Sequence, residues 1–366
     1  MKAASSHRRA RLSGIIAAQV SASVPDARLE ITELRHFPVR EPVSHRSYSI
    51  VRVRTRNGLS GFGEGPPISD SQFSRTQQYW LGKAATSYTT TGPRLPFSGA
   101  VDMALLDIIG KAANAPVYRV LGGPTRNKVR AFTSASIERA TAAGYRAVNV
   151  AMPAPAARNQ GQAYERDLRK MLDSLRTTGG DQMDFVLDGA GLLSPGDAAN
   201  VAMTIESMHP LWFDDPVAVA NSQTIRKIAD ESVVPLGFGR GITNPSTFQE
   251  LLRESLIDIL RPDIGREGIT GCRRIAALAE PYYVAVAPRH DGGSIGTAAA
   301  IQLAASLPNF FIQHIPLPDA EDDARMRAEI AGAQVERVHD GFAAIPTGPG
   351  LGINVNEAAL EKYHAA

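Results

Sequence analysis

The sequence predicts an α/β protein in which a (β/α)-barrel follows a smaller N-terminal α+β domain. Eight short apolar runs lie between residues 129 and 313, and amphipathic stretches separate them. Seven or eight strand–helix units in succession indicate a parallel sheet, and at this number closure into a barrel is favoured over an open sheet. Residues 31–120 precede these units and show a different pattern, of alternating strands followed by one apolar helix.

The N-terminal domain is predicted from two strand-like stretches and one helical stretch. Residues 29–39 and 47–65 alternate apolar and polar side chains, and Asn57-Gly58 divides the second stretch with a strong hairpin signal. Residues 98–116 carry apolar side chains at helical spacing and end at Pro116. We therefore expect a small α+β domain over residues 31–120.

The barrel is predicted over residues 121–319. Ser194-Pro195 and Asn244-Pro245 are typical helix starts, and Gly179-Gly180 ends an earlier helix. In such barrels the chemistry lies at the C-terminal ends of the strands. The predicted strands are Val129–Phe132, Ala147–Ala151, Phe185–Leu187, Leu211–Phe213, Pro235–Phe238, Ile257–Leu260, Tyr283–Ala287 and Phe310–Gln313.

Composition and charge exclude several classes of protein. The 366 residues carry 39 basic and 37 acidic side chains, a net charge of +2, so neither nucleic acid nor a membrane surface is expected as the main partner. No stretch approaches the ~18 continuous apolar residues of a membrane span. Cys272 is the single cysteine, which excludes an intrachain disulfide, and its apolar helical surroundings indicate a packed thiol rather than a nucleophile.

Residues 1–30 leave two interpretations open. Arg8-Arg9 precedes a weakly apolar stretch and then small residues, an order seen in twin-arginine export signals. The apolar run is short and interrupted by Gln19 and serines, which a basic tail explains equally well. A cytoplasmic location is favoured, and periplasmic export stays open.

Four segments resemble the mandelate racemase/muconate lactonizing branch of the enolase superfamily. They are VDMALLDIIGKAANAPVYRVLGG (101–123), RPDIGREGITG (261–271), VAPRHDGGSIGTAAAIQLAASLPNF (286–310) and GPGLGINVN (348–356), in the order of that branch. The resemblance implies a modified TIM barrel whose mouth is closed by a capping domain. Residues 31–120 would form that domain, completed by residues 320–366, where the alternation of residues 341–356 suggests a strand returning to it.

The resemblance also implies a metal site, which this sequence alters. Members of the branch hold a divalent cation, usually magnesium, on three carboxylates at the ends of the third, fourth and fifth barrel strands. Asp188 and Asp214 match the first two positions, and 26 residues further the third position is Arg240. A guanidinium there would repel a cation and could bond both carboxylates instead. We therefore expect no metal cofactor, with weakly bound magnesium as the alternative, and a contact from Arg240 to Asp188, Asp214 or both.

The acid and base positions of the branch are altered as well. After the second strand, Asn149 and Ala151 replace the Lys-x-Lys pair, which leaves Asn149 as a substrate-binding candidate. After the seventh strand, Arg289 stands at the place of a catalytic histidine, with His290 beside it. Asp263 resembles the aspartate that orients that histidine, and we expect it within hydrogen-bond reach of Arg289 or His290. The predicted catalytic residues are therefore His290, Arg289, Asp263 and Arg240, and His314 after the eighth strand is a second substrate-binding candidate.

Two functions remain open at this point. The first is an enzyme, a racemase or dehydratase, that removes the proton next to the carboxylate of a small hydroxy acid or sugar acid. The second is a barrel that has lost this chemistry and serves as a binding protein or catalyses another reaction, since fold alone does not fix function. The expected partner is a small carboxylate, and we expect a homo-oligomer.

Overall fold

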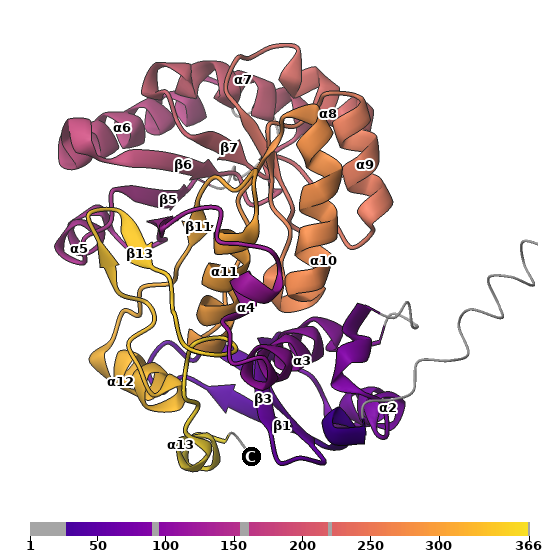
Figure 1. Cartoon of the computed structure of the whole chain (residues 1–366). Helices are drawn as coiled ribbons and strands as arrows, with labels where there is room; N and C mark the ends of the chain where they lie inside the picture. Colours follow the sequence, from indigo (N-terminus) through magenta and orange to yellow (C-terminus); the bar gives the residue numbers. More distant parts are fainter. Residues whose placement is uncertain (1–26, 90–94, 154–160, 219–221, 365–366) are drawn as a thin grey trace, which may run out of the picture.

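The computed structural model describes residues 27–89, 95–153, 161–218 and 222–364. Residues 1–26, on which the export and basic-tail interpretations rest, lie outside this range. Figure 1 shows the N-terminal domain below a barrel whose helices lie on its outside. No helix within the described ranges is both long and apolar enough to cross a membrane.

The N-terminal domain is a three-stranded antiparallel sheet covered by helices, in the order β1-β2-β3. The Asn57-Gly58 hairpin joins β2 to β3, and Gly58 takes a φ of 85°. Helix α3 lies directly against β3, where a Cβ on Gly61 or Gly63 would clash with a carbonyl oxygen of α3. The elements are β1 (Ile31–Arg40), β2 (Ser47–Thr55), β3 (Ser60–Gly65), α2 (Asp70–Trp80), α3 (Ser98–Ala112) and α4 (Val117–Val120), with a 3₁₀ turn at Ala85–Thr89.

Eight parallel strands close into the barrel, as predicted. Strands β5 to β10 pair in chain order, and β11 pairs with β4 in parallel. Bridges between Thr133 and Val148 and between Val286 and Phe310 join these two groups into a ring. The strands are β4 (Lys128–Phe132), β5 (Ala147–Ala151), β6 (Asp184–Asp188), β7 (Trp212–Asp214), β8 (Leu236–Phe238), β9 (Ile259–Leu260), β10 (Ala285–Val286) and β11 (Gln313–His314).

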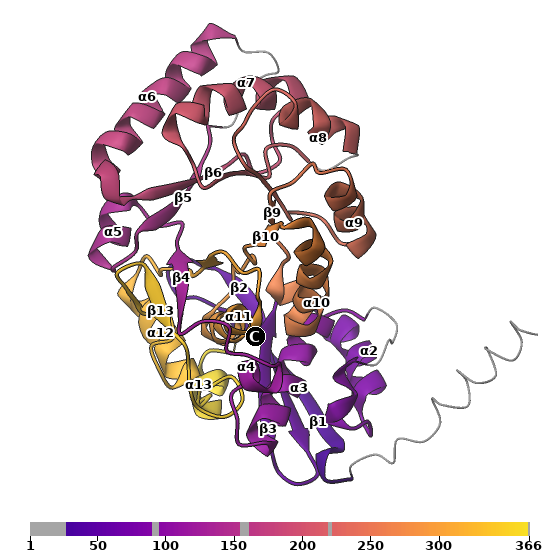
Figure 2. The same cartoon turned by 45° about the horizontal axis from the view of Figure 1, so that its top comes forward.

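The barrel helices begin at the caps that the sequence indicates. Ser194 and Asn244 each accept a backbone N–H bond as N-cap residues, with proline at the start of the helix that follows. Helix α11 is buried along its whole length and lies between the barrel and the N-terminal domain (Figures 1 and 2). The helices are α5 (Ile137–Ala142), α6 (Gln162–Gly179), α7 (Pro195–Ile205), α8 (Ser222–Ala229), α9 (Pro245–Arg253), α10 (Ile264–Ala279) and α11 (Ser294–Ser306).

The C-terminal segment contacts both parts of the molecule, which differs from the expected return to the first domain. It contains α12 (Glu321–Ala331), β12 (Val338–His339), β13 (Phe342–Ala344) and α13 (Glu357–Lys362). Strand β13 pairs antiparallel with residues 128–130, the N-terminal end of β4. The predicted alternation therefore belongs to a strand of the barrel's N-terminal face, and only later do Gly350 and α13 reach α3 and β1.

Candidate active site

A pocket of about 480 Å³ lies at the C-terminal ends of the barrel strands. Seven of the eight strands contribute a residue at or just after their ends, and the turn between β1 and β2 adds Arg46. Carboxyl ends of barrel strands are where (β/α)-barrel enzymes carry their chemistry. We call this the mouth pocket; its lining residues are Arg46, Phe132, Ser134, Asn149, Asp188, Arg240, Arg261, Arg289, Asp291 and His314.

Arg240, expected at the position of the third metal ligand, bonds Asp188, expected at the position of the first. Its Nη2 donates to Asp188 Oδ2 at 2.9 Å, so the predicted contact with Asp188 is confirmed. The Arg240 backbone N–H donates to Asp215 Oδ1 at 3.0 Å, which fixes the residue at the end of β8. The guanidinium therefore lies in the mouth pocket, partly exposed and paired with a carboxylate.

Asp214 lies deeper and pairs with a different arginine. Its Oδ1 accepts a hydrogen bond from Trp212 Nε1 at 2.9 Å and lies 3.2 Å from Arg261 Nε. Burial raises the pKa of Asp214 to about 7; the charges of Asp215 and Asp188 act in the same direction, and Arg261 and Arg289 oppose it. At neutral pH this carboxyl is therefore divided between its protonated and ionised forms.

Two charged residues of the site went unnoticed in the sequence, Arg261 and Asp215. Arg261 is 4% exposed, and its guanidinium carbon lies 5.0 Å from the ring centroid of Trp212. Asp215 Oδ2 lies 3.2 Å from Arg289 Nη1, and Asp215 Oδ1 accepts the N–H groups of Gly239 and Arg240. Both residues follow a barrel strand directly, so the rule that strand ends carry function would have found them.

The carboxylates of the site do not fit the three-carboxylate magnesium site of the branch. Magnesium prefers near-octahedral oxygen coordination. Asp188 is committed to Arg240 and to the backbone N–H of Ala190, and Asp214 to Trp212 and Arg261. Within the described part of the chain, no group of three or more acidic, histidine or cysteine side chains is arranged to hold a metal ion.

His314 is the histidine that faces the mouth pocket. Its Nδ1 lies 2.6 Å from the carbonyl oxygen of His290, and its Nε2 lies 3.0 Å from Ser134 Oγ. Because a carbonyl only accepts, Nδ1 carries the proton of the neutral ring and Nε2 keeps its lone pair. Burial lowers the pKa of His314 to about 4, against the influence of Asp291, so the ring is neutral at pH 7.

His290 and Asp263 lie outside the mouth pocket, contrary to the expected grouping. His290 Nε2 lies 3.0 Å from Gly293 O and 2.9 Å from Thr297 Oγ1, and the side chain is buried. Asp263 caps α10 through the backbone N–H of Arg266. It lies opposite Arg289 in a parallel bridge, in which the Arg289 backbone donates to Pro262 O and accepts from Ile264 N–H. Both residues line a separate pocket of about 240 Å³ beside Tyr48 and Glu64.

The structure therefore brings together most, but not all, of the predicted site residues. Arg289 points into the mouth pocket, where it bonds Asp215 and Asp291. The next side chain, His290, therefore points away from the pocket. Asn149 donates to Ser134 Oγ at 3.3 Å. Five of the predicted residues line the mouth pocket, with a sixth, Asp214, directly beneath: Asn149, Asp188, Arg240, Arg289 and His314.

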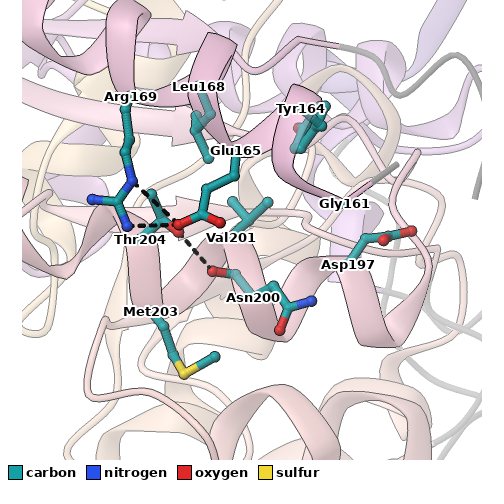
Figure 3. A pocket seen from close by; sticks show the side chains of 10 residues that line it. All are labelled: Gly161, Tyr164, Glu165, Leu168, Arg169, Asp197, Asn200, Val201, Met203 and Thr204. Carbon is teal, nitrogen blue, oxygen red and sulfur yellow. Dashed lines mark hydrogen bonds and ion pairs between the residues drawn. The ribbon is translucent and has the colours of Figure 1, made fainter. Parts of the chain in front are cut away.

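Another pocket, of about 430 Å³, lies on the outside of the barrel between α6 and α7. Figure 3 shows Glu165 and Arg169 of α6 bonded to each other there, at 2.6 Å between Oε1 and Nη2. Such i,i+4 pairs are typical of solvated helix faces. This pocket is remote from the strand ends; Glu165, Arg169 and Thr204 bond within their own helices, and the Tyr164 hydroxyl donates to Pro153 O.

Comparisons with known proteins agree with this architecture. Residues 133–359 match the family described as Enolase C-terminal domain-like. A "D-galactonate dehydratase family member ManD" of Chromohalobacter salexigens is 28% identical over 87% of this chain and 92% of its own length. The D-gluconate dehydratase of Thermoproteus tenax is 26% identical over 87% of this chain and 70% of its own.

A solved structure shows the same fold. A mandelate racemase/muconate lactonizing enzyme from Jannaschia sp. CCS1 superposes with a TM-score of 0.80, at 24% identity, over 92% of this chain and 98% of that one. The family match covers more than half of the chain. The chain belongs to the enolase superfamily, in its mandelate racemase/muconate lactonizing branch.

Proposed function

We propose that this protein is a dehydratase that acts on a small sugar-acid carboxylate without a bound metal, with His314 as the proton-transfer group. The comparisons support an enzyme of the racemase or dehydratase type, and the relatives include D-galactonate, D-gluconate and D-xylonate dehydratases. The observation that carries the proposal is the unprotonated Nε2 of His314, 3.0 Å from Ser134 Oγ, in a pocket lined by four arginines.

The arginines would bind the substrate carboxylate and stabilise the charge that develops on it. Arg261 is buried; its Nε lies 3.2 Å from Asp214 Oδ1, whereas its Nη1 has no hydrogen-bond acceptor among the described residues. An unpaired buried donor is costly, so an incoming carboxylate would gain a charge-assisted bond at this position. Arg240 and Arg289 add positive charge at the same pocket, and fixed charges in a water-poor site are the main source of such stabilisation.

A single facing histidine favours dehydration over racemisation. Racemisation needs an acid/base group on each face of the α-carbon, whereas Asn149 and Ala151 occupy the second position of the branch. One neutral imidazole can take the α-proton at Nε2 and return it to a hydroxyl leaving on the same face. We therefore assign the proton transfer to His314. His290 supports the loop behind it.

The test is proton NMR in deuterium oxide with a panel of aldonates, including galactonate, gluconate and xylonate. We expect loss of the α-proton signal and formation of a 2-keto-3-deoxy acid, equally with added EDTA and with added magnesium. His314→Asn should slow the reaction by about 100-fold or more, in the range that general acid–base catalysis supplies. His209→Asn, on an exposed turn far from the mouth pocket, is the matched control and should keep wild-type rates.

Other outcomes would contradict the proposal. Activity that appears only with magnesium would show that the carboxylates bind metal despite their arginine partners. Absence of α-proton loss and of product with every aldonate would support the alternative of a barrel that has lost this chemistry.

A further inference from the structure

Ser134 and His314 form a hydroxyl–imidazole pair, of which the proposed dehydration uses the imidazole but not the hydroxyl. Ser134 follows β4 and His314 ends β11, and these two strands are neighbours in the barrel. Ser134 Oγ lies 3.0 Å from His314 Nε2, within hydrogen-bond reach. Ser134 is exposed to the mouth pocket, whereas His314 is 8% exposed. An accessible hydroxyl thus stands against a buried base.

The imidazole is held in the form that a general base requires. The carbonyl oxygen of His290, 2.6 Å from Nδ1, accepts the ring proton and leaves Nε2 as an acceptor for the serine hydroxyl. Asp291 Oδ1 lies 3.7 Å from Nδ1 and supplies negative charge on the side of the ring opposite the serine. A nucleophile, a base and a third group that orients the base are the parts by which nucleophilic catalysis is recognised.

We propose that Ser134 is a nucleophile, with His314 as its general base, and that the mouth pocket hydrolyses a small ester or lactone of a hydroxy acid. This activity shares His314 with the proposed dehydration but requires no α-proton to be removed, so either reaction can occur without the other. A lactone fits the pocket chemically because ring opening releases a hydroxy-acid carboxylate, the group that Arg261 and Arg240 are placed to bind.

The reaction balances with water as the second reactant. Ser134 Oγ forms a bond to the acyl carbon while its proton moves to His314 Nε2. The tetrahedral intermediate then breaks the bond to the alkoxy oxygen, which takes the proton from Nε2. A water molecule attacks the acyl-serine, gives one proton to Nε2 and releases the acid, and that proton returns to Ser134 Oγ. The negative charge of each intermediate develops among the arginine side chains of the pocket.

The first test is covalent labelling of the full chain by a fluorophosphonate, followed by intact and peptide mass spectrometry. We expect one adduct per chain, located on Ser134. Ser134→Ala should abolish the adduct, and His314→Asn should slow its formation by about 100-fold. Ser207→Ala removes an exposed serine remote from the pocket and should label like wild type. Thermal unfolding of Ser134→Ala verifies the fold, since that substitution removes only an exposed hydroxyl.

The second test is turnover of 4-nitrophenyl acetate and of an aldono-1,4-lactone, compared with the α-proton exchange assay on the same preparation. Labelling and hydrolysis without α-exchange would support the nucleophile and contradict the dehydratase. Exchange of the α-proton without labelling would support the dehydratase and contradict the nucleophile. Absence of an adduct in the wild type, or equal labelling in Ser134→Ala, would overturn the inference.

Discussion

At the scale of single residues, we expect Arg240 to determine which ions the mouth pocket binds. Its guanidinium bonds Asp188, and the resemblance predicts a third carboxylate at this position in the branch. Arg240→Glu should therefore restore a cluster of carboxylates and create magnesium binding, measurable by titration calorimetry. Arg240→Gln removes the cation without adding a ligand, so it should bind more weakly than Arg240→Glu. Wild type should bind least, because close like charges repel. Equal magnesium affinity in all three proteins would refute this order.

Residue directions were harder to predict than residue positions. The sequence places a cation at the end of the fifth strand, and the structure confirms its contact with Asp188. Arg289 and His290 are consecutive in an extended segment, so their side chains point to opposite sides. Only the register of that segment decides which of the two faces the pocket, and register depends on packing against α11. The structure places His314 in the mouth pocket and His290 outside it, and their roles stay predictions.

At the scale of elements, the turn after β10 and the start of α11 should respond to pH. His290 is buried against Gly293 and Thr297. Its pKa is lowered to about 3, mainly by burial and to a smaller extent by the nearby His314. The unfolded chain takes up that proton near pH 6.5, so the stability from this group is complete above pH 6.5 and is lost as the pH falls toward 3.

Urea denaturation of wild type and His290→Gln at pH 7.5 and pH 5.0 measures this effect. The free energy of unfolding of wild type should fall by about 2 kcal/mol more than that of the variant between these pH values. His339→Gln, at an exposed position on β12, is the control and should keep the pH dependence of wild type. The same loss in all three proteins would mean that His290 is not the source.

Elements were predicted better than the connections between distant segments. The eight strands and the Asn57-Gly58 hairpin follow from local apolar patterns and turn chemistry, and the structure confirms them. The pairing of β13 with β4 does not follow from such patterns, because alternation shows that a segment is a strand without showing its partner. The arginine–aspartate pairs of the site are equally hard to predict from local patterns, because each joins residues from different strands.

At the scale of the whole molecule, α12 lies beside the N-terminal domain (Figure 1) and bonds the turn between β1 and β2. Asp323 accepts the backbone N–H groups of Val43 and Ser44, both at 2.9 Å. Arg327, one turn further on, bonds Glu41 at 2.7 Å and Glu336 at 2.8 Å. These contacts hold the turn between β1 and β2, which carries Arg46 to the pocket, where its Nη1 donates to Asp291 O at 3.4 Å.

Arg327→Met should therefore disturb both stability and catalysis. Arg327 and Glu41 are each 1% exposed, so removal of the cation leaves a buried carboxylate without its partner. Breaking a buried pair from one side costs about 3–5 kcal/mol in the free energy of unfolding, which urea denaturation would measure. Arg325→Met is the matched control, because Arg325 lies on the same helix, is exposed and pairs with exposed Asp322. Its effect should stay within about 0.5 kcal/mol. Equal effects of the two substitutions would show that this helix does not fasten the domain through Arg327.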